Sequence, residues 1–211
     1  MDTHPKMIHI LTYRLFSPWR FWFIHDESKL LYVLNWVFPL ILSLIITIVI
    51  EAICLYSDNL SMCMLWKDLL RLVENSNFLP GFFIAALAAI AVFEKNSMDE
   101  ILPGAKLYYK DIEGRRVELT RRRLLCMLFS FLSAQSFCLI ALTQIVDNLF
   151  GTYCNQKCDN VVFSYIFVKD ALLFDYSYLI LYFLILFLYI QIFLIMLYGM
   201  YYLGERIHYK N

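Results

Sequence analysis

The sequence predicts an all-α integral membrane protein with four transmembrane helices and a small cytoplasmic β-hairpin between the second and third helices. Hydrophobic residues make up 61% of the 211 residues and the mean hydropathy is +0.63, which excludes an ordinary soluble domain. Four apolar runs approach or exceed the roughly 20 residues that cross a bilayer as a helix. Lys and Arg cluster on alternate sides of these runs, as the topology of such a protein requires.

The four spans belong to one transmembrane domain over residues 30–203. The second span is the shortest, so we expect its polar neighbours Asn77 and Glu94 to lie at the two interfaces. The fourth span is longer than a crossing requires, which favours a tilt or an extension into water. The expected spans are residues 30–55, 78–93, 124–146 and 178–203.

The distribution of Lys and Arg predicts that both termini and the central loop are cytoplasmic. Segments 1–29, 94–123 and 204–211 hold fourteen of these residues, whereas the outer loops 56–77 and 147–177 hold four. Positive residues near span ends remain on the cytoplasmic side. Because 18 Lys and Arg balance 18 Asp and Glu, we expect no direct binding of nucleic acid.

Two segments outside the spans are expected to be amphipathic helices. Residues 1–29 form a cytoplasmic interfacial segment in which apolar residues recur over 7–16, followed by the aromatic stretch 19–23 as a membrane anchor. In the first outer loop, helical spacing predicts a helix that lies on the outer leaflet. Its apolar face is expected to comprise Leu65, Leu69, Leu72 and Val73.

The second span has a face of small residues. Gly81, Ala85 and Ala89 are spaced four apart, which places them on one side of a helix. Small residues at this spacing let helix backbones approach closely. We therefore expect this face at the centre of the bundle or at a contact between subunits of a homo-oligomer.

The third span carries a polar stripe of Ser133, Ser136, Thr143 and Asp147. Two interpretations remain open: the stripe lines a water-filled path, or it forms hydrogen bonds between helices. Gln191 is the strongly polar residue inside the fourth span. No Lys, Arg, Asp or Glu lies near the middle of any span, which argues against an ion-coupled transporter.

The six cysteines form two groups. Cys126 and Cys138 lie in the third span and are expected to act as small apolar residues. The other four fall on the outer side, where structural disulfides, free thiols and thiol redox chemistry all remain open. Redox chemistry is the least favoured, because neither outer loop has the CxxC spacing of a fast exchange couple. These disulfide candidates are Cys54, Cys63, Cys154 and Cys158.

The central loop has the pattern of a β-hairpin. Leu107 and Tyr109 alternate opposite Val117 and Leu119 around a turn that contains glycine. After it, Thr120 suits the N-cap of the third span, and Arg121, Arg122 and Arg123 suit the lipid headgroups. A compact aromatic and basic projection is typical of a docking surface for a cytoplasmic protein. The expected docking residues are Tyr108, Tyr109, Lys110, Arg115 and Arg116.

The sequence contains no recognisable catalytic motif. It has no Walker loop, GxSxG, HExxH or zinc-type CxxC pattern, and its four histidines lie outside the spans. We therefore expect no enzymatic activity, no cofactor and no metal site.

Residues 79–137 resemble part of a known family. The stretch PGFFIAALAAIAVF, and after a short acidic turn LPGAKLYYKDIEGRRVELTRRRLLCMLFSFLSAQSF, is similar to small four-span proteins of bacterial anti-phage defence loci, in particular the membrane component of the Kiwa system. The resemblance implies an oligomeric, tetrameric sensor in the bacterial inner membrane that works with a cytoplasmic DNA-binding effector. It implies no catalytic residue and does not extend to the outer cysteines.

Together these patterns predict a sensor and scaffold that detects an envelope perturbation and recruits a cytoplasmic effector. One alternative is a pore or ion channel that depolarises the membrane, with the polar stripe of the third span as its lining. A further, less favoured alternative is a membrane thiol oxidoreductase that uses the outer cysteines.

Overall fold

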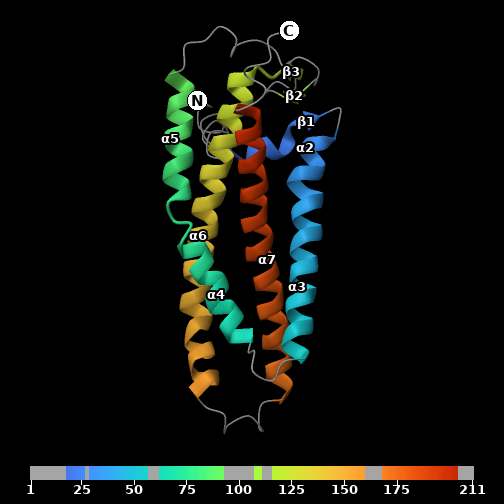
Figure 1. Ribbon diagram of the computed structural model, residues 1–211, viewed down its shortest axis with the longest axis vertical. Helices are drawn as coiled ribbons and strands as arrows, with labels where there is room; N and C mark the ends of the chain where they lie inside the picture. Colours follow the sequence, from blue (N-terminus) through green and yellow to red (C-terminus); the bar gives the residue numbers. More distant parts are fainter. Residues whose placement is uncertain are drawn as a thin grey trace, which may run out of the picture. The chain divides into compact units, whose positions relative to one another are not determined.

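The computed structural model describes residues 18–26, 29–56, 62–92, 107–110, 116–159 and 168–203. These residues form helices and a small antiparallel sheet (Figure 1). Four helices are long and apolar enough to cross a membrane, which confirms the predicted fold class and indicates a multi-pass membrane protein. The expected helix over 7–16 and the tail 204–211 lie outside the described residues. The four candidate crossings are Leu30–Ile53, Leu65–Val92, Arg121–Asn148 and Leu179–Tyr201.

The chain divides into two compact units. Unit 1 comprises the described residues within 1–35, 80–134 and 195–211, and unit 2 comprises those within 36–79 and 135–194. Two long helices contribute residues to both units. They are α6 (Arg121–Asp159) and α7 (Val168–Tyr201).

The first crossing changes its helical type near its start. It begins as α2 (Leu30–Tyr32), widens into the π-helical segment η2 (Val33–Val37) and continues as α3 (Phe38–Tyr56). Pro39 accounts for the widening, because its ring lacks an N–H and cannot fit a regular preceding turn. Many apolar side chains of α3 are exposed, which suits contact with lipid tails. They include Leu40, Ile41, Leu44, Ile45, Ile48 and Val49.

The second crossing consists of two helices, α4 (Met62–Glu74) and α5 (Leu79–Val92), joined by a short turn. The expected helix in the first outer loop is therefore present. Leu72 is 43% exposed in the single chain, whereas Leu69 and Val73 are buried. The buried side chains of α4 keep spacings of three and four residues, as one face of a helix requires. They are Trp66, Leu69, Leu70 and Val73.

Helices α6 and α7 extend beyond the expected spans. The predicted outer loop 147–177 is mostly helical, because α6 continues to Asp159 and α7 begins at Val168. Hydropathy marks only the part of a helix that lies in hydrocarbon, whereas the hydrogen-bonded helical backbone can continue into polar sequence that contains no proline. Residues 160–167 between the two helices lie outside the described residues.

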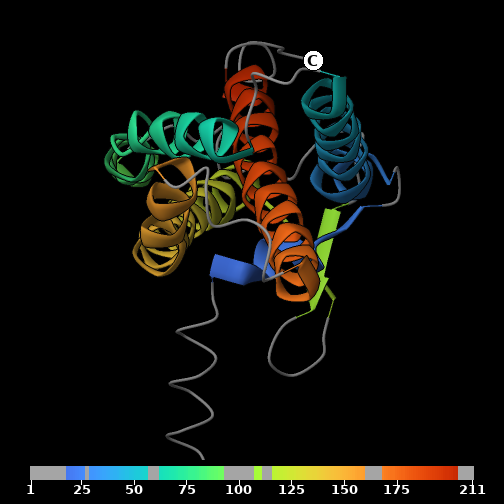
Figure 2. The ribbon, with the colours of Figure 1, turned by 90° about the horizontal axis from the view of Figure 1, so that it is seen from below.

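The sheet has three strands in the order β1 (His25–Asp26), β2 (Leu107–Lys110) and β3 (Arg116–Glu118). Strands β2 and β3 pair antiparallel with Tyr109 opposite Val117, as the hairpin prediction requires. Strand β1, which the sequence reasoning missed, adds to the edge of β2. Figure 2 shows the yellow-green hairpin strands beside the blue N-terminal segment.

An aromatic cluster forms part of the core of unit 1. The segment expected as a membrane anchor is a 3-10 helix, η1 (Pro18–Phe23), and it packs on Phe131 of α6. The Phe131 ring lies 5.2 Å from the ring of Phe21, 5.7 Å from that of Trp22 and 5.9 Å from that of Trp19. These aromatic residues therefore hold the N-terminal segment against α6.

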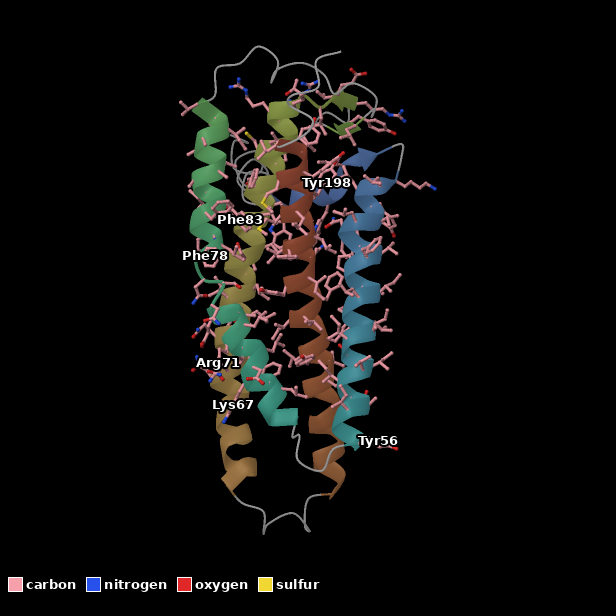
Figure 3. All side chains as sticks on the ribbon, in the orientation of Figure 1. Tyr56, Lys67, Arg71, Phe78, Phe83 and Tyr198 are labelled. Atoms are coloured by element: carbon pink, nitrogen blue, oxygen red, sulfur yellow. The ribbon has the colours of Figure 1, made fainter. Side chains whose placement is uncertain are left out.

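Unit 1 also contains two close contacts of α6. A Cβ built on Gly199 of α7 would lie 3.0 Å from Leu128 Cδ2, so a glycine lets the two helices approach. On the other side, Phe83 of α5 lies 6.3 Å from Phe129, ring to ring, and Figure 3 shows Phe83 between α5 and α6. Both contacts place α6 at the core of this unit.

Candidate functional site

The face of the sheet that carries Tyr108 is the best-defined candidate site. Leu107 and Leu119 are 3% and 1% exposed, and the Leu119 N–H donates to the Leu107 carbonyl at 3.0 Å. Side chains alternate along a strand, so Tyr108 and Arg116 belong to the opposite face. The Arg116 guanidinium lies 5.1 Å from the centre of the Tyr108 ring, within cation–π range.

This face presents a preorganised aromatic and basic pair to solvent. Arg116 is exposed and Tyr108 is partly exposed. Glu118 is also exposed and pairs with Tyr108 in the register. Stacking on the ring orients the guanidinium without neutralising its charge, so Arg116 remains available to an acidic group.

The other predicted docking residues are only partly described. The backbones of Tyr109 and Lys110 lie in β2, but their side chains and the whole of Arg115 lie outside the described residues. The register places position 109 opposite Val117, on the strand face that alternation assigns to Leu107. Tyr108 rather than Tyr109 is therefore the aromatic residue to test first.

The N-terminus of α6 follows the sheet directly. As predicted, Thr120 precedes the helix, and its hydroxyl accepts the Arg123 N–H at 3.4 Å. The three arginines of the first turn differ in burial, with Arg121 buried, Arg122 intermediate and Arg123 exposed. The sequence gives no reason to distinguish the three arginines, so their difference in burial is visible only in the folded chain.

The small-residue face of α5 is exposed. Gly81, Ala85 and Ala89 are all exposed, and a Cβ built on Gly81 would meet no atom within 4 Å. The helix buries a different side, which includes Phe83 and Ile90. The small residues are therefore not at a close contact within the described chain.

Residues of the polar stripe on α6 have mixed environments. Ser136 and Thr143 are buried, Ser133 is partly exposed and Asp147 is exposed. The Thr143 hydroxyl donates to the Ile140 carbonyl of its own helix at 2.8 Å. Thr143 therefore satisfies its hydroxyl without water.

A buried amide pair in unit 2 was not predicted as a pair. Gln135 of α6 and Gln191 of α7 are 1% and 0% exposed, and Gln135 Nε2 donates to Gln191 Oε1 at 2.6 Å. Gln135 Oε1 has no hydrogen-bond partner within the part of the chain that the structure describes. Both amides were visible in the sequence as polar residues inside spans, but no periodicity relates residues on separate helices.

Helix α4 carries an exposed charged face opposite its buried side. Positive and negative side chains alternate along this face, and Figure 3 labels the two cations, Lys67 and Arg71. The turn after α4 is tied to α7 within unit 2, because the Ser76 and Tyr189 hydroxyls lie 3.3 Å apart. The charged residues are Lys67, Asp68, Arg71 and Glu74.

The cysteines give no sign of a redox or metal centre in the described residues. Cys126 and Cys138 are free thiols, half-buried and exposed respectively. The side chains of Cys54, Cys63, Cys154 and Cys158 lie outside what the structure describes, so the disulfide predictions stay open. No group of three His, Cys, Asp or Glu within the described ranges could hold a metal ion.

The fold and the site define a multi-pass membrane protein with a small aromatic and basic sheet face. No protein-family model, curated protein or solved structure matches the chain.

Proposed function

We propose that the chain is a membrane-embedded sensor and scaffold that recruits a cytoplasmic effector protein through the Tyr108 face of its sheet. The observation that carries the proposal is the Arg116 guanidinium held over the Tyr108 ring, on the face opposite the buried leucines. Binding energy at interfaces concentrates in aromatic residues and arginine. A pair that is already oriented loses less conformational freedom on binding.

The charges beside this pair favour a partner with an acidic surface. Arg116 and Arg123 are exposed cations on β3 and in the first turn of α6, and Glu118 is the exposed acid between them. Complementary charge accelerates association and makes it sensitive to salt. An acidic effector would therefore bind more weakly as the salt concentration rises.

The exposed small-residue face of α5 supports assembly into a homo-oligomer. Gly81, Ala85 and Ala89 are uncovered in the single chain, and such a face allows close backbone contact with a second copy. The remaining parts of the proposal come from the resemblance to the Kiwa membrane component. It favours a tetramer in the bacterial inner membrane, termini in the cytoplasm, an envelope signal from phage infection, and a DNA-binding effector.

The docking proposal is tested by purifying the tagged chain from the membrane and measuring retention of its soluble partner. Tyr108→Ala and Arg116→Ala should each weaken binding by about 1–3 kcal/mol, because each removes one member of the stacked pair. Lys67→Ala on α4 is the matched control, since it removes an exposed cation elsewhere in the chain. Equal partner retention by all three variants would refute the docking role.

A pore is the second candidate function, and the charged face of α4 favours it. Helix α5 has 14 residues, which span about 21 Å, less than the roughly 30 Å hydrocarbon core. The candidate crossing therefore includes α4, as the range Leu65–Val92 indicates. Exposed charges at that depth need water or a polar surface, because lipid tails cannot solvate them.

Ion flux in reconstituted liposomes distinguishes the pore from the scaffold. If the α4 face lines a pore, Arg71→Glu should shift selectivity towards cations, because it replaces a positive lining charge with a negative one. Glu118→Arg, a charge reversal on the sheet, is the control and should leave selectivity unchanged. Absence of flux under all conditions, with partner binding intact, would leave the scaffold function alone.

A further inference from the structure

Strand β3 is an edge strand within the part of the chain that the structure describes. The sheet order is β1-β2-β3, so β2 pairs with one side of β3 and no described strand pairs with the other. An unpaired edge presents backbone N–H and C=O groups that bind a further strand readily. The docking role proposed above concerns the Tyr108 face of the sheet and leaves this edge unused.

The register of the hairpin determines which backbone groups of β3 face outwards. The Leu119 N–H donates to the Leu107 carbonyl at 3.0 Å, so these two residues form a hydrogen-bonded pair. Hydrogen-bonded pairs alternate along an antiparallel ladder, so Val117, two residues earlier, also belongs to such a pair and directs its N–H and C=O to β2. The N–H and C=O groups of Arg116 and Glu118 therefore face the free edge.

The charges along this edge are complementary to themselves. If a second β3 lies antiparallel to the first with Val117 at the centre, Arg116 of each copy lies opposite Glu118 of the other. Each of these two pairs joins opposite charges, and each exchanges two backbone hydrogen bonds, because the same residues carry the outward N–H and C=O groups. A parallel pairing in register would place like charges opposite each other. Both charged residues are exposed in the single chain.

Val117 favours the same register through an apolar contact. By alternation its side chain belongs to the sheet face of Leu107 and Leu119, and it is partly exposed. At the centre of the pairing, the two copies of Val117 form a non-hydrogen-bonded pair, in which the Cα atoms are about 4.5 Å apart and the side chains are close. The backbone groups, the charges and the apolar contact therefore all agree on one arrangement.

We propose that two copies of the chain pair at the β3 edge and form one continuous antiparallel sheet, with three strands from each copy. The pairing is two-fold symmetric, which is the commonest symmetry of protein oligomers. Its axis is perpendicular to the sheet, so the dimer presents the Tyr108 face of both copies on the same side. The Tyr108 ring does not neutralise Arg116, which therefore still attracts Glu118 of the second copy. The pairing requires neither a cytoplasmic effector nor the small-residue face of α5.

Disulfide cross-linking of the full chain in membranes tests the register. Val117→Cys places one thiol of each copy at the centre, where a Cα separation of about 4.5 Å allows a disulfide. Glu118→Cys is the matched control, because its two copies would lie about 8 Å apart, beyond disulfide range. Mild oxidation should give at least about tenfold more covalent dimer with Val117→Cys than with Glu118→Cys or the unchanged chain, whose native cysteines set the background. Equal dimer in all three would overturn the proposal, as would a mixed disulfide with another protein in place of the dimer.

Exchange of the two charges tests the antiparallel pairing. In the Val117→Cys chain, Arg116→Glu would place acidic groups opposite each other and should lower the yield of covalent dimer by about fivefold or more. Adding Glu118→Arg restores opposite charges in the reverse order, so the yield should return to within about twofold of that of Val117→Cys alone. This exchange removes the guanidinium from the Tyr108 ring, so docking of an effector should stay impaired while the pairing recovers. Tyr108→Ala should impair docking and leave the cross-link unchanged, so the two proposals can fail separately. Failure of the exchange to restore the cross-link would refute the pairing.

Discussion

Replacement of Gln191 by leucine tests whether the buried amide pair joins α6 to α7 in unit 2. In the wild type, Gln135 Nε2 donates to Gln191 Oε1 at 2.6 Å, while Gln135 Oε1 has no partner among the described residues. Gln191→Leu would leave both polar atoms of an amide that is 1% exposed without a partner. Burying such an unsatisfied group costs about 1–3 kcal/mol.

The double variant separates the hydrogen bond from a simple change in packing. Gln135→Leu with Gln191→Leu removes both amides of the pair, so neither is left buried without the other, and its stability should exceed that expected from the sum of the two single effects. The coupling energy should be about 0.6 kcal/mol, the average for hydrogen bonds between membrane helices, and no more than about 1.7 kcal/mol. Reversible unfolding in mixed detergent micelles measures all four free energies of unfolding.

Gln144→Leu provides the control for this cycle. Gln144 is exposed on α6, so its replacement should change the free energy of unfolding by less than about 0.5 kcal/mol. The reasoning fails if the double variant is destabilised by the sum of the two single effects. Additivity would mean that the two amides do not interact, whatever their separation in the structure.

Three further predictions concern assembly, packing and topology. Ala85→Leu should lower the oligomer mass in detergent while insertion stays intact, because it widens the exposed small-residue face; an unchanged mass in light scattering would remove this face from the assembly. Gly199→Leu should destabilise the chain by about 1–3 kcal/mol, because even a Cβ would lie 3.0 Å from Leu128 Cδ2; unfolding at the wild-type denaturant concentration would contradict this. A tag at Gly114 should be inaccessible from outside intact spheroplasts, and labelling there would reverse the proposed orientation.

Local sequence patterns were sufficient to predict the apolar helices and the β-hairpin. An apolar run predicts a helix, and the expected second span 78–93 coincides with α5 at Leu79–Val92, although the candidate crossing begins earlier, at Leu65. The hairpin depends on strand alternation and a short turn, and its Tyr109 to Val117 register follows from both. These features involve residues that are close in sequence.

Features that depend on distant residues were missed or misplaced. Strand β1 is two residues long and has no pattern of its own, so only its pairing with β2 identifies it. The periodicity of α4 was visible, but the choice between Leu72 and Trp66 for its buried face depends on what packs against the helix. Gln135 and Gln191 are separated by 56 positions and belong to different helices.

The sequence by itself determined the class of protein, the presence of four apolar helices and the position of the hairpin, because hydropathy and alternation act over one helix or one turn of chain. The tertiary structure alone decided which face of each element is covered. It exposed Gly81 and Ala85, which the sequence placed at the centre of the bundle or at a contact between subunits, and it buried Arg121 while leaving Arg123 exposed. Burial depends on the neighbours that other segments bring to a residue, and no local pattern specifies those neighbours.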